Sequence, residues 1–196
     1  MSKPRKDGGF PPADMPVKTV HAGWLDLHLV QLRAPDGGTY ERYVEDHGRA
    51  AAVLPYNPRT RMALLVTMPR AALRFAGGED VVEVPAGLVD AGETAADAAR
   101  RELSEETGLA VTTLEPAGAI LTMPGVSTER IDLFLAAYAD DQRTGAGGGL
   151  ASENENITVI EMPLAALWAL IDGDLAADAK TRVLVQTLRI RRPDLF

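Results

Sequence analysis

Three glutamates near the middle of the chain are the residues best suited to chemistry. Glu102, Glu105 and Glu106 lie within an arc of about 100° if this stretch is helical. Like charges at such spacing repel one another, so the helix needs a positive partner. Hard divalent cations such as Mg²⁺ or Mn²⁺ prefer all-oxygen ligands of this kind. The pattern predicts a divalent metal site, and the alternative interpretation is a solvated acidic helix face.

The flanking residues predict the helix that must carry these acids. Thr94 followed by Asp97 is typical of a capping box, so we expect the helix to begin just after Glu93. Gly108 is typical of the left-handed residue that ends a helix. Alanines on the same side as the acids would let this helix lie close to other backbone. We therefore expect the acids to face a packed interior cleft.

Residues 87–109 fill a longer pattern. They read GLVDAGETAADAARRELSEETGL and fit G-x5-E-x7-R-E-U-x-E-E-x-G-U, where U is aliphatic. This is the Nudix box, so the chain resembles the Nudix hydrolases, which cleave a nucleoside diphosphate linked to another moiety. The resemblance implies an α+β fold, a Nudix α/β/α sandwich with a mixed central sheet, and dependence on Mg²⁺ or Mn²⁺.

The resemblance also implies roles for the residues of the box. The carbonyl of Ala86 and the carboxylates of Glu102 and Glu106 would bind metal, with Glu105 as a further ligand or catalytic group. Gly87 would let the backbone approach the ions closely. The residues with structural roles in the motif would be Gly87, Glu93, Arg101 and Gly108. Of these, Glu93 and Arg101 are expected to pair.

Residues 123–129, Met-Pro-Gly-Val-Ser-Thr-Glu, are similar to the Ser-Pro-Gly-Gly-x-x-Glu segment of ADP-ribose and GDP-mannose pyrophosphatases. Val126 stands where those enzymes usually have a second glycine. The resemblance implies that Glu129 binds substrate. The alternative is a Pro-Gly turn between two strands.

A glycine-rich segment follows at residues 141–157. Its Asp-Gln-Arg and Ala-Gly-Gly-Gly runs resemble the GDP-mannose pyrophosphatase branch, and we interpret the glycines as giving mobility to a loop that closes over substrate. In related enzymes the acid matching Glu153 is the catalytic base, and Glu155 is the second candidate here. The alternative is a solvated acidic surface loop.

Residues before the box carry weaker signals. Arg70 matches an arginine that related enzymes use to hold substrate, although Met68 stands where glutamine is common, and a surface arginine is the alternative. Trp24 is interpreted either as a core residue or as a stacking partner for a nucleobase in the cleft of a second subunit. The histidines lie away from the box, which excludes a catalytic triad: His21, His28 and His47.

Composition narrows the class of protein. The chain has 196 residues and a net charge of −8, and no Lys/Arg block is long enough to follow a nucleic-acid backbone. It has no cysteine, which excludes disulfides, thiolate zinc sites and cysteine nucleophiles. No apolar run approaches a membrane span or a signal peptide, so we expect a cytoplasmic protein without membrane partners.

Three parts are expected along the chain. Residues 1–16 read as a disordered or loose arm, residues 17–47 as an antiparallel β subdomain, and residues 48–196 as the Nudix hydrolase domain. The subdomain would contain one long strand at 17–33 and a return strand at 39–44. Its likeness to that of Nudix enzymes implies a homodimer. Further expected strands are 48–56, 62–68, 81–84, 109–121, 131–138 and 156–161, with closing helices at 164–173 and 176–191.

The function expected from these features is hydrolysis of the pyrophosphate bond of a nucleoside diphosphate sugar, of the GDP-mannose or ADP-ribose type. The products would be a nucleoside monophosphate and a sugar phosphate. One alternative is a non-catalytic Nudix module that senses a nucleotide sugar, although such modules typically lose box acids and this chain has them all. Another is a Nudix hydrolase for a nucleoside triphosphate or a dinucleotide.

Overall fold

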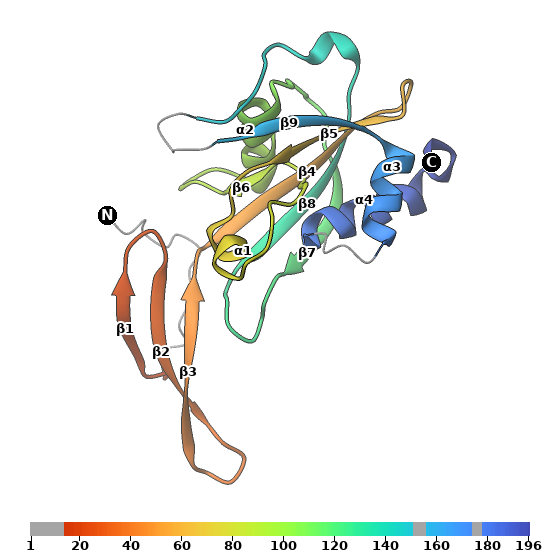
Figure 1. Ribbon diagram of the computed structural model, residues 1–196. Coiled ribbons are helices and arrows are strands. Elements are labelled where there is room, and N and C mark those ends of the chain that lie inside the picture. The colour runs from red at the N-terminus through yellow and green to blue at the C-terminus, as the bar shows by residue number, and fades with distance from the viewer. Residues whose placement is uncertain (1–13, 151–155, 174–177) are drawn as a thin grey trace.

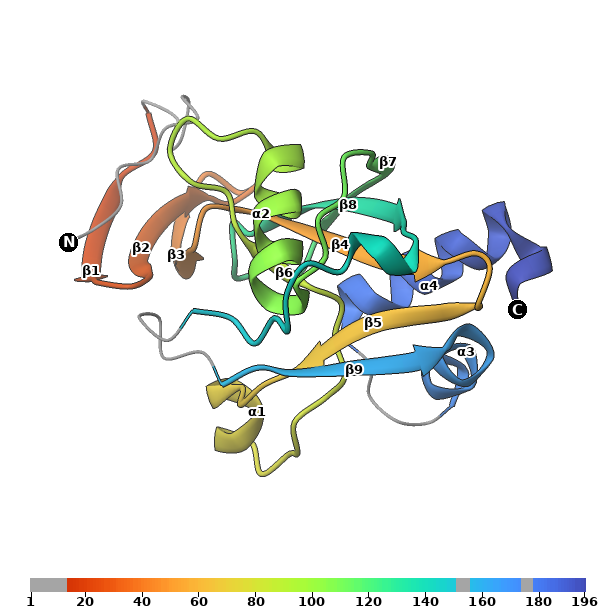
Figure 2. The same ribbon diagram turned by 90° about the horizontal axis from the view of Figure 1, so that it is seen from above.

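Two β-sheets and the helices against them make up the computed structural model, which describes residues 14–150, 156–173 and 178–196. One sheet has three strands in the order β1-β2-β3. The other has six, in the order β7-β8-β4-β5-β9 with β6 beside β4. The three-stranded sheet and the C-terminal helices lie at opposite ends of the molecule (Figures 1 and 2).

The three-stranded sheet is antiparallel and consists of β1 (Val17–Ala22), β2 (Asp26–Arg33) and β3 (Thr39–Asp46). The single long strand expected at residues 17–33 is therefore wrong. The chain reverses at Gly23, whose backbone N–H faces the Asp26 carboxylate at 3.4 Å. The alternation of apolar residues continues through this turn, which is why the pattern concealed it. Most of the expected N-terminal arm, residues 1–16, lies outside the described residues.

The six-stranded sheet is mixed, as the sequence predicted. Its central strand β4 (Arg49–Asn57) runs parallel to β8 (Arg130–Ala137) and antiparallel to its other neighbours. The remaining strands are β5 (Met62–Thr67), β6 (Ala86–Leu88), β7 (Glu115–Leu121) and β9 (Thr158–Pro163). The strand expected at residues 81–84 is reduced to one bridge between Glu83 and Val66, because the segment crosses here from β5 to β4.

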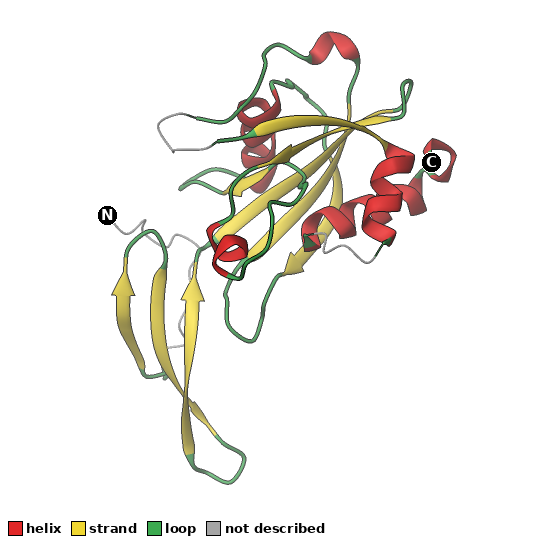
Figure 3. Ribbon diagram, in the orientation of Figure 1, coloured by secondary structure: helices red, strands yellow, loops and turns green. Residues whose placement is uncertain are grey.

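Helices cover both faces of this sheet (Figure 3). Alternate residues of β4 point to opposite sides, so that Leu54 joins a core with α3 and α4, whereas Val53 joins a core with α2. The helices are α1 (Ala71–Phe75), α2 (Ala95–Thr107), α3 (Leu164–Asp172) and α4 (Ala179–Arg191), with short 3-10 turns at Asp140–Gln142 and Pro193–Leu195. Along the described ranges, no helix is long and apolar enough to cross a membrane.

Both ends of α2 follow the sequence prediction. The Thr94 hydroxyl accepts a hydrogen bond from the Asp97 backbone N–H at 3.1 Å and caps the first turn. Gly108 ends the helix with a left-handed φ of 74°. Because both ends are defined by local contacts, the direction of the three box acids is defined as well.

The glycine-rich segment packs against the C-terminal end of α2. Thr144 N–H donates to the Gly108 carbonyl at 2.8 Å, and Gly148 N–H donates to that of Glu106 at 2.9 Å. A Cβ on Gly147 would lie 2.3 Å from the Glu106 carbonyl oxygen, so only glycine fits. The structure thus gives these glycines a packing role at the helix end, and the mobility of the loop stays a prediction.

This packing predicts that Gly108→Ala is more destabilising than a comparable change elsewhere. Gly108 and Gly92 have similar φ values, 74° and 85°, so an alanine at either position is strained by roughly 1 kcal/mol. Only at Gly108 would the new Cβ also meet backbone, 2.2 Å from the Gly145 oxygen. We expect Gly108→Ala to lower the free energy of unfolding by about 3 kcal/mol. Equal losses in urea unfolding of the two variants would contradict this account.

Candidate active site

The box acids lie between α2 and the backbone of β6. Glu106 is 1% exposed and Glu102 is 9% exposed, whereas Glu105 is half-buried. The Ala86 N–H donates to Glu106 Oε2 at 3.3 Å, and a Cβ added to Gly87 would stand 1.9 Å from Glu102 Oε1. The acids therefore face a packed interior, as predicted, and two of them lie directly against residues 86 and 87.

Arg101 compensates two of these acids, Glu102 and Glu105. Its Nε and Nη2 donate to the two oxygens of Glu93, both at 3.1 Å, which confirms the expected pairing. Its Nη2 also donates to the Leu88 carbonyl at 2.9 Å. On its other side Nη1 donates to Glu102 at 2.8 Å and to Glu105 at 3.3 Å. The hydrogen bond from Arg101 lowers the pKa of Glu93, so the loop and the helix stay tied by charge.

The donor atoms of this region suit a hard divalent cation. In the described ranges, no group of three or more Asp, Glu, His or Cys side chains is arranged to hold a metal ion as it stands, and Arg101 occupies oxygens of Glu102 and Glu105. A backbone carbonyl, for which Ala86 is the candidate, would complete a set with the carboxylates of Glu102 and Glu106. The donors are then all oxygen, and glycine at 87 leaves room where a Cβ would displace Glu102.

Arg70 lies at the start of α1 and is held by an acid that the sequence analysis missed. Its Nε and Nη2 donate to Glu83 Oε1 and Oε2 at 2.7 and 2.8 Å. Burial raises the pKa of Glu83, but Arg70 and Lys180 outweigh it and hold that pKa below its ordinary value. Glu83 was detectable as one acid inside the apolar run Val-Val-Glu-Val-Pro. A role of Arg70 in binding substrate stays a prediction.

The segment with Glu129 is a turn that touches the three-stranded sheet. Val126 N–H donates to the Met123 carbonyl at 2.9 Å, while Glu45 N–H donates to the Val126 carbonyl at 2.8 Å. Glu129 Oε2 accepts a hydrogen bond from the Thr122 hydroxyl at 2.8 Å. The turn thus joins β3 to the edge of the larger sheet. These contacts do not test whether Glu129 binds substrate, so that role stays a prediction.

The two candidate bases, Glu153 and Glu155, lie outside the described residues. The chain that precedes them is placed, because Gly149 N–H donates to the Glu105 carbonyl at 3.1 Å.

Trp24 and the three histidines lie on the three-stranded sheet and its junction. Trp24 is 80% exposed, so the core interpretation is wrong, and its ring meets the edge of the His47 ring at 5.2 Å between centroids. His28 is buried beside the Thr19 hydroxyl, and His47 lies 3.6 Å from a Glu45 oxygen. These contacts agree with packing and surface roles for the histidines.

Comparison with known proteins decides the family. A model of the NUDIX domain matches residues 46–182. The chain belongs to the Nudix family. The protein named GDP-mannose pyrophosphatase in Cronobacter sakazakii (strain ATCC BAA-894) is 38% identical over 154 residues, 78% of this chain and 79% of that relative. The protein of that name in Escherichia coli O157:H7 is 35% identical over 179 residues, 88% of this chain and 92% of the relative.

A solved structure has the same fold as this Nudix chain. The crystal structure of an ADP compounds hydrolase superposes with a TM-score of 0.71 and covers 98% of both chains at 19% identity. At this identity the likeness shows the fold alone, and it confirms the predicted Nudix α+β architecture. Family membership also implies a divalent metal ion, for which the oxygen donors described above are suited.

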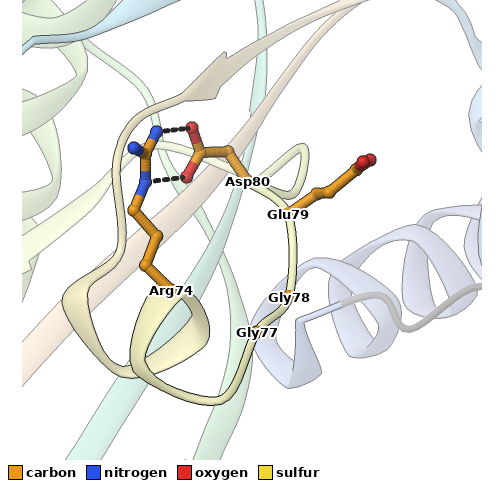
Figure 4. A pocket seen from close by; sticks show the side chains of 5 residues that line it. All are labelled: Arg74, Gly77, Gly78, Glu79 and Asp80. Atoms are coloured by element: carbon orange, nitrogen blue, oxygen red, sulfur yellow. Dashed lines mark hydrogen bonds and ion pairs between the residues drawn. The ribbon is translucent and has the colours of Figure 1, made fainter.

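A surface cavity lies beside the loop that follows Arg70 in this Nudix protein (Figure 4). It is lined by Arg74, Gly77, Gly78, Glu79 and Asp80, and no residue of the box contributes to it. Arg74 Nε and Nη2 donate to the two Asp80 oxygens at 3.2 and 2.7 Å. This ion pair closes the loop on itself.

The contact between Gly87 and Glu102 predicts that Gly87→Ala displaces the metal-site carboxylate. The new Cβ would overlap Glu102 Oε1, whereas a Cβ on Gly145 would meet only ordinary contacts, the nearest at 3.8 Å. We expect Gly87→Ala to weaken binding of Mn²⁺ by about tenfold or more in calorimetric titration, because one ligand moves. Gly145→Ala is the matched control and should bind Mn²⁺ as the wild type does. Unchanged affinity in Gly87→Ala would remove Glu102 from the ligand set.

Proposed function

We propose that this Nudix chain hydrolyses the pyrophosphate bond of a nucleoside diphosphate sugar of the GDP-mannose or ADP-ribose type. The products are a nucleoside monophosphate and a sugar phosphate. The observation that carries the proposal is the placement of two buried box carboxylates, Glu102 and Glu106, against the backbone of Ala86 and Gly87. The similarity to GDP-mannose pyrophosphatases at 35–38% identity supports the substrate class.

The proposed cation is Mg²⁺ or Mn²⁺, because every candidate donor is oxygen. Ala86, Glu102 and Glu106 would hold it, with Glu105 as a further ligand. When bound, such a cation neutralises charge that develops on the phosphates and lowers the pKa of a bound water.

The chain's own residues supply positioning and proton transfer. Arg101 joins the loop to the helix through Glu93 and Leu88 and so keeps the metal-binding face in place. Arg70 would bind a phosphate of the substrate, and Glu129 would contact another part of it. Glu153 would take the proton from the attacking water, with Glu155 as the second candidate.

Retention of the box acids favours catalysis over sensing. Glu102, Glu105 and Glu106 are all present, whereas Nudix modules that only sense a ligand typically lose one or more box acids.

We also propose that the chain acts as a homodimer through residues 17–47, with residues 48–196 as the hydrolase domain. The three-stranded sheet supports this because it exposes apolar side chains. The exposed residues are Val17, Val20, Trp24, Tyr40 and Tyr43.

A substrate panel tests the activity directly. GDP-mannose, ADP-ribose, NADH and nucleoside triphosphates are incubated with Mg²⁺ or Mn²⁺, and the phosphate products are separated. We expect the highest kcat/KM on a nucleoside diphosphate sugar. Glu106→Gln should lower kcat by about 10³-fold or more while the fold survives, because a metal ligand is lost. Hydrolysis of triphosphates alone would replace the proposed substrate class.

The base assignment has its own test. We expect Glu153→Gln to lower kcat by about 10²-fold or more, because the water loses its proton acceptor, while Mn²⁺ affinity is unchanged. Glu155→Gln is the matched control, with a smaller effect on kcat. If only Glu155→Gln slows turnover, the base is Glu155.

A further inference from the structure

The guanidinium of Arg70 uses only part of its hydrogen-bonding capacity on the protein. Nε and Nη2 donate side-on to Glu83, and among the described residues these are the hydrogen bonds of this side chain. An arginine has a second fork, formed by Nη1 and Nη2, which suits two oxygens of a phosphate. The Arg70 side chain is 40% exposed, so this end-on fork is accessible.

Arg70 lies in the electrostatic field of the box. The side-chain hydrogen bond to Glu83 raises the pKa of Arg70 most, and the charge of Glu106 contributes to the same shift. The negative charge of this box acid thus helps to keep Arg70 cationic.

Glu83 is held from behind by the first turn of α4. Lys180 Nζ donates to Glu83 Oε2, and it also donates to Asp178 Oδ1 at 2.9 Å. Lys180 is 7% exposed and Glu83 is 3% exposed, so neither side chain can turn toward solvent without unpacking. The neighbouring Thr181 hydroxyl accepts from the Val84 N–H at 2.9 Å, which fixes the backbone beside Glu83.

We propose that Glu83 and Lys180 are positioning residues that direct the Nη1–Nη2 fork of Arg70 toward a phosphate of the substrate. The proposal rests on the proposed function, since it requires Arg70 to bind substrate. Glu83 clamps one edge of the guanidinium, and Lys180 prevents the Glu83 carboxylate from rotating away. The series Lys180–Glu83–Arg70 thus links the C-terminal helix to the phosphate site.

A contribution to the stability of the fold does not by itself explain why Lys180, Glu83 and Arg70 are charged. Buried ion pairs repay their desolvation only in good geometry, and well-packed apolar side chains often serve stability equally well. Orientation is a different matter, because a guanidinium held on one edge loses less freedom when its other edge binds a phosphate.

A double-mutant cycle separates positioning from support of the fold. Steady-state kinetics on the best substrate of the panel compare wild type, Arg70→Ala, Lys180→Met and the double variant. We expect Arg70→Ala to raise KM by about 10- to 100-fold, and Lys180→Met to raise it by about tenfold with kcat nearly unchanged. In the Arg70→Ala background, Lys180→Met should have no further effect on KM.

Arg74→Ala is the matched control, because Arg74 forms a bidentate pair with Asp80 but does not touch Glu83. Its KM should equal that of the wild type. If Lys180→Met does not fold, Glu83→Asp takes its place: it keeps the charge but withdraws the carboxylate from Arg70, and the same rise in KM is expected.

The possible outcomes test the positioning role separately from the proposed hydrolysis. A rise in KM for Lys180→Met that persists unchanged in the Arg70→Ala background overturns the positioning role and leaves a structural one. An Arg70→Ala variant with wild-type KM also overturns it, because there is then no bound phosphate to position. The proposed hydrolysis is unaffected by either result and fails only if the panel finds no turnover of a nucleoside diphosphate sugar.

Discussion

The burial of like-charged carboxylates against backbone is the interaction on which the rest of the structure depends. Glu102 and Glu106 lie within a turn of each other and close to residues 86 and 87. Their repulsion grows as water is removed, so the arrangement favours compensating cations. Arg101 supplies part of this charge and a divalent cation would supply the remainder. A cluster of acids on the solvated surface would not need such compensating cations.

The need to compensate these buried charges explains why both ends of α2 are held by specific contacts. Thr94 caps one end, and the segment with Gly147 and Gly148 caps the other by donating to the last carbonyls of the helix. Elsewhere, Lys180 of the C-terminal helix and Glu83 restrain Arg70. Rigid support of this kind is what catalysis by charge requires, since groups already in place need no reorganisation when the reaction proceeds.

Local features of the sequence carried most of what could be predicted. The capping residues, the glycine at the helix end and the spacing of the glutamates act within α2 itself, so position along the chain translates into geometry. The same holds for the Glu93–Arg101 pair. Alternating apolar residues predicted most strands, but the alternation continued through Gly23 and joined two strands into one. Helix α1, a single short turn with no buried residue, had no periodicity to reveal it.

The sequence by itself therefore determined the box helix, the family and the α+β class. The helix depends on contacts between residues close along the chain, the family is recognised from the spacing of the box residues, and the class follows from the family. Only the tertiary structure decided what lies against that helix. It placed Gly87 on Glu102, packed Gly147 against the helix end, and joined Glu83 to Lys180 across 97 positions of sequence. Such pairs are set by how sheets and helices stack, and no local pattern of residues records which distant side chain will complete an ion pair.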